Sequence, residues 1–478
     1  GTLSQSQSFT RSSLPETSAA PSQSLTQQSQ TQTQQRGAQT GMPPGRVSRK
    51  YQHLFDSPTS GKLAGLESTA AEKSVAVEEA DDASLETQLA DAATNIGDMF
   101  KNIPFNRVEW VTSGFLITTA LLTLTAVPWY FWTYGWDWFL FAVFLFFYVA
   151  TGMSITLGYH RLFSHKAFKA SWPVRLFVLL FGAAAFENSA LWWSSEHRKH
   201  HKHVDTDDDP YDISKGFFWA HIGWLMFKLK PVPPLDNVKD LRKDKLLMIQ
   251  HKWVHLISFV VSFGVPALIG YFYAVYSGNL SPAVGALGGL LIPGVARVVM
   301  VQHATFCINS LCHMIGKRPY STSHSARDSW VAAIFTMGEG YHNYHHEFEW
   351  DYRNGVKPWQ LDPSKWIIWT LSKFGLAYDL RRVPREKILL AETRETERKL
   401  NDQISLFQDS IAESANELME QALSSLEDAS QRLREICNEL QTAAQERIKL
   451  SKAKINELRM EVRSLMSEIE SSGKLALA

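Results

Sequence analysis

Apolar residues are concentrated in one part of the chain, between about Val108 and Cys307, while both ends are polar. Four segments in this region reach the length of about 20 apolar residues that a membrane-spanning helix needs. Very short connections, TYGWD and SGNLS, join the first span to the second and the third to the fourth, which predicts two helical hairpins. The predicted spans are Trp110–Phe131, Trp138–Tyr159, Val254–Tyr276 and Leu280–Cys307.

The polar ends differ from each other. Residues 1–60 are rich in Ser and Gln and cannot bury enough apolar surface to become ordered, so we expect disorder there. Residues 61–107 are acidic and predict a linker with an amphipathic helix, and residues 108–384 form the membrane domain. Residues 385–478 are highly charged, with apolar residues three and four apart, which predicts a coiled-coil-like helical tail. The predicted seams are Ile404, Phe407, Ile411 and Leu418, and Ile455, Leu458, Val462, Leu465 and Ile469.

Basic residues indicate the orientation in the membrane. The two short connections contain no Lys or Arg, whereas the long segments after the second and fourth spans contain many. By the positive-inside rule these long segments are cytosolic, in the endoplasmic reticulum of a eukaryote or the inner membrane of a bacterium. The formal net charge of zero argues against a nucleic-acid-binding protein.

A fifth apolar stretch, Pro173–Trp193, is shorter and is interrupted by Glu187 and Asn188. It could be a fifth span, but we expect a helix at the interface or within the cytosolic domain. A fifth span would place the histidine clusters described below on opposite sides of the membrane.

The sixteen histidines of the chain include nine that fall in four clusters. Residues i, i+3 and i+4 share one face of a helix, so the two HxxHH clusters each present three imidazoles together. Neutral imidazole binds iron, copper and zinc, and nine histidines suit two metals better than one. Zinc sites have fewer histidines, so iron with oxygen chemistry fits better. The clusters are His160 and His165; His197, His200 and His201; His313; and His342, His345 and His346.

The other seven histidines are interpreted as packed or surface residues, because an isolated histidine is more often one of these than a ligand. They are His53, His203, His221, His251, His255, His303 and His324.

The motifs HRLFSH, EHRKHH, NSLCH and GEGYHNYHH resemble those of the membrane fatty acyl desaturases, specifically the Δ9 (stearoyl-CoA-type) group. The resemblance covers about Val108 to Pro384. It implies an all-α integral membrane fold: four transmembrane helices with a cytosolic helical cap that holds a diiron site. It also implies two Fe²⁺ ions bound by the nine clustered histidines, with Asn309 reaching one iron through water.

The resemblance further implies O2-dependent desaturation of a saturated acyl thioester, acyl-CoA or another, at the Δ9 position, giving a cis double bond and water. It implies substrate contacts at Asn188, Trp193 and Thr305, with Tyr148 and Gly152 closing the far end of an acyl tunnel. The tail has no HPGG-like haem motif, so electrons are expected from a separate cytochrome b5 or a ferredoxin with its reductase. Ser195 stands where animal enzymes have an arginine for coenzyme A, which puts the acyl carrier in question. The tail is also a candidate for oligomerisation.

Two other functions compete with this interpretation. A membrane diiron hydroxylase of a lipid would use the same histidines but insert oxygen, and the mass of the product would distinguish it. A scaffold or receptor with a structural metal site would bind its partners through the tail. Measurements of iron content and oxygen consumption would distinguish this function from an oxygen-using enzyme.

Overall fold

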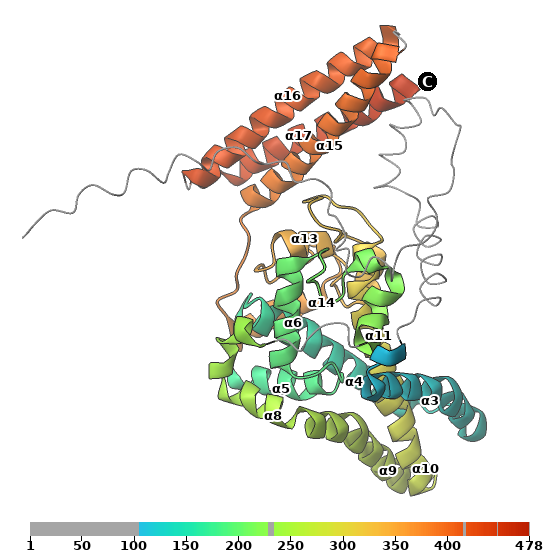
Figure 1. Ribbon diagram of the computed structural model, residues 1–478. Helices are drawn as coiled ribbons and strands as arrows, with labels where there is room; N and C mark the ends of the chain where they lie inside the picture. Colours follow the sequence, from blue (N-terminus) through green and yellow to red (C-terminus); the bar gives the residue numbers. More distant parts are fainter. Residues whose placement is uncertain (1–104, 228–233, 414–416, 447, 478) are drawn as a thin grey trace, which may run out of the picture. The chain divides into compact units, whose positions relative to one another are not determined.

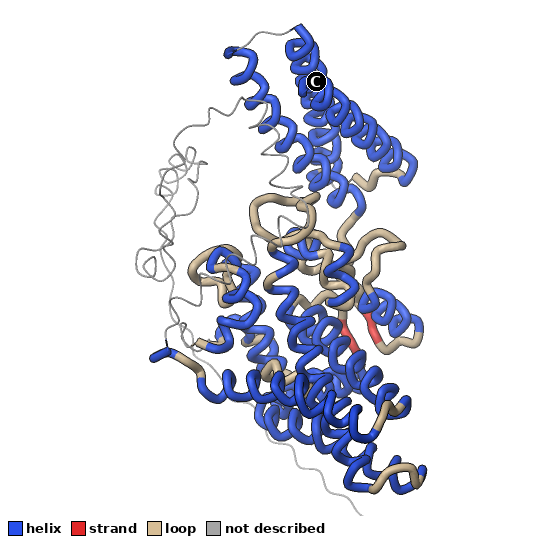
Figure 2. The backbone as a smooth tube through the Cα atoms, turned by 90° about the vertical axis from the view of Figure 1, so that its right-hand side faces the viewer, coloured by secondary structure: helices blue, strands red, loops and turns tan. Residues whose placement is uncertain are grey.

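The computed structural model describes residues 105–227, 234–413, 417–446 and 448–477. The expectations for residues 1–60 and 61–104 lie outside the described residues. The described part is mainly helical, and its only sheet has two short strands (Figures 1 and 2).

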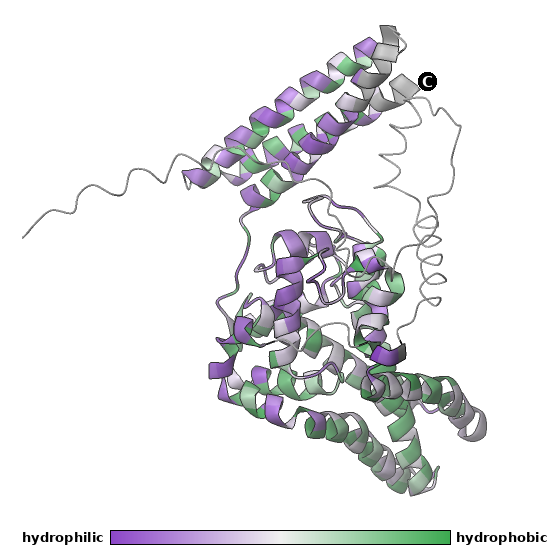
Figure 3. Cartoon of the chain, in the orientation of Figure 1, coloured by the Kyte–Doolittle hydropathy of each residue, from purple (hydrophilic) through white to green (hydrophobic). Residues whose placement is uncertain are grey.

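Four helical runs are long and apolar enough to cross a membrane, which confirms the four predicted spans. The second and fourth runs end several residues later than predicted, and the third run begins several residues earlier than predicted. In Figure 3 the helices α3, α9 and α10 of these runs are largely hydrophobic. The runs consist of α3 (Trp110–Tyr134); α4 (Trp138–Met153) with η4 (Ser154–Ser164); α8 (Lys245–Phe259), η9 (Val260–Gly264) and α9 (Val265–Ser277); and α10 (Pro282–Gly289), η10 (Leu290–Ala296), α11 (Arg297–Asn309) and η11 (Leu311–His313).

Local signals explain where the hairpins turn. Asp137 caps α4 by accepting a hydrogen bond from the Leu140 amide, and Ser281 caps α10 in the same way. Gly270 in α9 and Gly285 in α10 lie so close that a Cβ on either would collide with the backbone of the other. Small residues therefore let the two helices of this hairpin pack at short distance, as is common in membranes.

The long segment between the second and third spans contains no spanning helix among its described residues. Its apolar helix α5 (Trp172–Ala183) has 12 residues, about 18 Å at 1.5 Å per residue, which is too short to cross a bilayer. The expectation of a non-spanning helix is therefore confirmed. The segment continues with α6 (Ala190–His203), η5 (Ile213–Lys215), η6 (Trp219–Gly223), α7 (Trp224–Met226), η7 (Asp236–Val238) and η8 (Leu241–Lys243), and η3 (Phe105–Arg107) precedes the first span.

The segment after the fourth span folds back onto the region that follows the second. β1 (Lys169–Ala170) pairs antiparallel with β2 (Ala377–Tyr378), as Figure 2 shows in red. A buried core that includes Tyr159, Phe168, Leu191 and Ile368 joins these segments. The remaining helices here are α12 (Trp330–Phe335), α13 (His342–Glu347) and α14 (Pro363–Lys373).

The tail forms three helices that pack on one another: α15 (Arg385–Glu413), α16 (Glu417–Gln445) and α17 (Lys452–Leu477) (Figure 1). The predicted seam residues Ile404, Ile455, Leu458, Val462 and Leu465 lie in one buried cluster, with Ile469 packed against it. The side chains of Phe407, Ile411 and Leu418 lie outside the described ones. The seam is thus covered by the chain's own helices.

The start of α15 also packs against the membrane domain. Ile388 and Ala391 share a buried cluster with Tyr320, Tyr344 and Phe348. The boundary between residues 384 and 385 stays a prediction, and the first turns of the tail contribute to the core around α13.

Candidate metal centre

The nine predicted histidine ligands come from four places in the sequence and meet in one buried region. All nine side chains are buried or half-buried. They form two groups, and within each group the ligand atoms lie within 4.8 Å of one another. The five-histidine group is His160, His165, His197, His201 and His345, and the four-histidine group is His200, His313, His342 and His346.

Helical periodicity explains how one cluster serves both groups. On α6, His197 and His201 are four residues apart and join the five-histidine group, while His200 faces the other. On α13, His345 joins the five-histidine group, whereas His342 and His346 join the four-histidine group. The rings of His201 and His346 stack with their centroids 4.2 Å apart, so the two groups lie side by side.

The HxxxxH cluster needs a different explanation. Five residues along an α-helix turn the side chain by about 140°, which would separate His160 from His165. η4 is a π-helix, and the amide of His165 donates to the carbonyl of His160 over 3.1 Å, an i to i+5 bond. The wider turn brings both rings into the same group, with centroids 4.8 Å apart.

Six of these imidazoles are held in the neutral form that binds metals. Ring nitrogens face one another at short distance, for example Nε2 of His165 and of His197 at 2.8 Å. Burial, with the neighbouring histidines, lowers the pKa of the ligands outside the spans well below its ordinary value. This holds for His165, His197, His201, His342, His345 and His346. Converging neutral nitrogens of this kind fit two transition-metal ions, iron among them.

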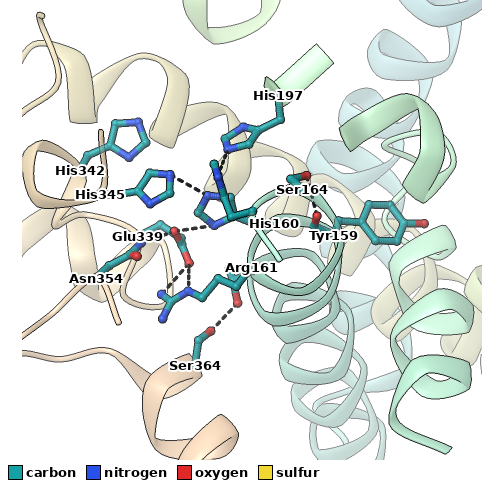
Figure 4. A network of polar contacts seen from close by, with 12 residues as sticks. Tyr159, His160, Arg161, Ser164, His197, Glu339, His342, His345, Asn354 and Ser364 are labelled. Atoms are coloured by element: carbon teal, nitrogen blue, oxygen red, sulfur yellow. Dashed lines mark hydrogen bonds and ion pairs between the residues drawn. The ribbon is translucent and has the colours of Figure 1, made fainter. Parts of the chain in front are cut away.

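A buried carboxylate orients the first histidine (Figure 4). Oε2 of Glu339 lies 3.0 Å from Nδ1 of His160, and Oε1 accepts a 2.8 Å bond from Nη2 of Arg161. Burial alone would raise the pKa of Glu339, but the positive charge of Arg161 and the hydrogen bonds from His160 and Arg161 hold it well below its usual range. Because the carboxylate carries no proton, the ring must donate from Nδ1, which leaves Nε2 for a metal.

Other polar groups hold further ligands in the same way. Nδ1 of His200 lies 2.9 Å from both oxygens of Asp209, and Nδ1 of His313 lies 2.7 Å from Oγ of Ser325. The orienting roles of Glu339, Asp209 and Ser325 were not predicted from the sequence. Glu339 had a visible signal, since it stands three residues before His342 in the GEGYHNYHH motif, but Asp209 and Ser325 had none.

Comparison with known proteins now adds to this geometry. The family model described as fatty acid desaturase matches residues 136–382, more than half of the chain. The chain belongs to the fatty acid desaturase family. With its four apolar helices, this makes it an integral membrane protein.

The chain is similar to relatives from fungi and animals. It is 45% identical over 267 residues to acyl-CoA desaturase 1 of Saccharomyces cerevisiae, covering 55% of this chain and 50% of that one. It is 44% identical over 244 residues to a probable acyl-CoA desaturase of Schizosaccharomyces pombe, covering 51% and 49%. Human stearoyl-CoA desaturase is 32% identical over 303 residues, covering 60% of this chain and 79% of that one. The chain thus spans about half the length of the two yeast relatives.

An apolar cavity of about 340 Å³ adjoins the candidate metal centre. Three of the five predicted substrate contacts line it, and so does His197 of the five-histidine group. The cavity therefore reaches the centre, and the indole of Trp193 stacks on the His197 ring at 4.8 Å. Its walls include Asn188, Trp193, Thr305, Asn309, His197 and Glu187.

The cavity wall includes the carboxyl group of Glu187, a residue that stands out in the sequence only because it interrupts an apolar stretch. Glu187 accepts a 2.8 Å hydrogen bond from the Thr305 hydroxyl and a 3.2 Å bond from the Trp193 indole. It therefore bridges two of the predicted substrate contacts. Burial raises its pKa to about 8.

Tyr148 and Gly152 are not among the residues that line this cavity. Tyr148 is half-buried and packs against the cores of the spans. A Cβ on Gly152 would meet the Sδ and Cε atoms of Met337. Their role at the far end of a tunnel stays a prediction.

Proposed function

We propose that this chain is a desaturase that removes two hydrogens from neighbouring methylenes of a saturated acyl-CoA, using O2 and two irons. The observation that carries the proposal is the contact between the five-histidine group and the apolar cavity, which share His197. The printed names of the relatives, acyl-CoA desaturase and stearoyl-CoA desaturase, support it.

Iron, when bound, supplies the oxygen chemistry that an unactivated C–H bond requires, since no side chain is a strong enough base. The chain's own residues supply position. The apolar walls bind the acyl chain and exclude water, and Trp193 lines the cavity while its indole stacks on the ligand His197. Regioselectivity then depends on which methylene pair the cavity holds beside the centre, and we propose the Δ9 pair.

The ligand set we propose is the nine histidines, with Asn309 acting through water. Asn309 lines the cavity and stands four residues before His313 on the helical run that ends in η11.

The acyl carrier and the electron donor are further parts of the proposal. Ser195, where a basic residue would attract coenzyme A, is buried and donates a 2.7 Å hydrogen bond to Asn237. Carrier recognition therefore rests on other residues. As the electron donor we propose cytochrome b5 or a ferredoxin. The histidine side faces the cytosol because the basic segments lie on it. Oligomerisation through the tail would use its outer face, since Leu433 and Leu458 are buried inside the bundle.

Expression in a host without its own acyl desaturase tests the function. The host's lipids should gain monounsaturated chains two mass units lighter than the saturated precursor, with the double bond at Δ9. The His200→Ala variant is the matched control. Products sixteen mass units heavier would mean a hydroxylase, and unchanged lipids despite a folded, iron-loaded protein would overturn both functions.

A further inference from the structure

The first helix of the tail contacts a loop that lies beside the four-histidine group. This loop, residues 320–326, follows the fourth span and precedes α12. Oε2 of Glu395 in α15 accepts 3.2 Å hydrogen bonds from both the amide and the hydroxyl of Thr322. Glu395 is only 6% exposed, and its Oε1 accepts a 2.9 Å bond from Arg398. Because a buried carboxylate is costly to leave unpaired, this contact fixes the loop against the tail.

A second contact joins the same two elements. Tyr320, at the start of the loop, is buried in a cluster with Ile388 and Ala391 of α15. Its hydroxyl group hydrogen-bonds to Glu392, and burial together with that carboxylate raises the pKa of Tyr320 well above its ordinary value. The hydroxyl therefore keeps its proton and donates the hydrogen bond. The loop is thus attached to α15 through two side chains, those of Tyr320 and Thr322.

The other side of the loop holds one of the predicted metal ligands. Oγ of Ser325 lies 2.7 Å from Nδ1 of His313 and donates its own hydrogen to the carboxylate of Asp205. The Ser325 oxygen therefore accepts from His313, which places the ring proton on Nδ1 and leaves Nε2 for a metal. The orientation of the His313 ring thus depends on where the loop holds Ser325.

The ends of the loop are fastened to α13. The side-chain oxygen of Asn343 accepts a 2.9 Å bond from the Tyr320 amide, and its NH2 group donates a 2.9 Å bond to the Ala326 carbonyl. Asn343 is fully buried and directly follows the ligand His342 in the sequence. Because Asn343 fixes the two ends of the loop, the contact with Glu395 is left to fix its middle.

The two histidine groups differ in how they are oriented. His160 of the five-histidine group is held by Glu339, which lies within the membrane domain. His313 of the four-histidine group is held through a loop that the tail anchors. A change at the contact between the tail and the loop should therefore act on one group and spare the other.

We propose that Glu395 is a positioning residue of the metal centre: by anchoring the loop 320–326, it lets the tail set the metal affinity of the four-histidine group. The inference rests on the proposed diiron function, since it concerns the occupancy of the second site. It gives the tail a role at the metal centre although none of the nine predicted ligands lies in it.

The test is a Co²⁺ titration of the full-length metal-free protein in detergent, with chelator competition to give the dissociation constant of each site. Glu395→Ala removes both acceptor oxygens and keeps a good helix former in α15. We expect two tight sites in the wild type. In the variant, one site should be unchanged and one weakened by about 10-fold, the lower end of the range for an orienting group, because Ser325 itself remains. Hydrogen exchange of the metal-free variant should be faster in residues 320–326 and unchanged in α6.

Glu397→Ala is the matched control, because Glu397 lies on the same helix and pairs with Arg434 within the tail at 3.1 Å. Two tight sites in Glu395→Ala, as in this control, would overturn the positioning role alone. Equal weakening of both sites would also overturn it, because that result would mean a general loss of structure. Fewer than two sites in the wild type would overturn the diiron function as well.

A double-mutant cycle tests the route from Glu395 to the metal. His313→Ala removes the ligand through which Glu395 acts, so adding Glu395→Ala to it should change the affinity of the weakened site by less than about twofold. A further tenfold loss in the double variant would contradict the proposed route.

A milder variant covers the case in which Glu395→Ala does not fold. Thr322→Val removes only the hydroxyl and keeps the volume of the side chain, so one of the two bonds to Glu395 remains. We expect it to weaken the same site by about threefold. Wild-type affinity at both sites in Thr322→Val would count against the proposal.

Discussion

Replacing Glu339 by Gln should destabilise the protein and weaken one metal site. Glu339 is 1% exposed. Its Oε1 accepts bonds from Nε and Nη2 of Arg161 at 3.2 and 2.8 Å, and its Oε2 accepts from Asn354 at 2.5 Å and faces His160. Gln has the same shape but only one acceptor oxygen. In either orientation its NH2 group therefore meets a donor, from Asn354 or from Arg161.

The magnitude follows from the charges involved. Removing one partner of a buried ion pair costs about 3–5 kcal/mol. Arg161 keeps Asp362 at 3.0 Å, so we expect a loss of about 2–4 kcal/mol in the free energy of unfolding at neutral pH. Because the folded pKa of Glu339 lies below its ordinary value, this contribution is present above that ordinary value and is lost as the pH falls below about 4.5.

The same change acts on the metal through His160. Without an anionic acceptor at Nδ1, the ring is less basic at Nε2 and less firmly oriented. Loss of such a partner typically weakens metal binding about 10- to 100-fold, and here it should affect the five-histidine group only. The four-histidine group should bind as before.

Thermal unfolding of the metal-free protein, at neutral pH and at pH 4, and Co²⁺ titration measure both effects. Glu349→Gln is the matched control, because that carboxylate is 53% exposed and lies 3.6 Å from Nδ1 of His165 and of His201. A Glu339→Gln variant as stable as this control, with both sites unchanged, would refute the reasoning.

Three further changes test other parts of the site. Alanine at His200 or His345 should abolish desaturation and lower the iron content, and full activity with two irons would contradict the ligand set. The contribution of Glu187 to the free energy of unfolding should fall as the pH rises from 4.5 to about 8, because folding then buries a carboxylate, and unfolding curves of Glu187→Gln should lack this contribution when compared with the wild type across that range. Gly152→Leu should shift product profiles toward shorter acyl chains, whereas Gly152→Ala meets only the flexible end of Met337 and should not; equal loss at all lengths would mean packing.

The sequence was most informative where one local rule decides the outcome. Runs of about 20 apolar residues need a bilayer, so the four spans were predictable, although the third run begins nine residues before its predicted start. The HxxHH spacing places three imidazoles on one helical face, so a metal centre was predictable before any tertiary contact was known. The seam residues of the tail were also visible, because a period near 3.5 marks a buried helical stripe.

Other features depend on contacts between residues far apart in the chain. The π-helical turn that unites His160 and His165 has no sequence signal of its own. The division of nine histidines into groups of five and four depends on how α6 and α13 meet.

The same limit applies to the polar residues around the site. Glu339 lies 3.0 Å from His160, although the two residues are far apart in the sequence. Sequence periodicity by itself therefore determined which elements form and which faces carry the histidines. Tertiary packing decided which nitrogens converge and which carboxylates orient them, because those distances are set by the meeting of separate helices and not by spacing along one.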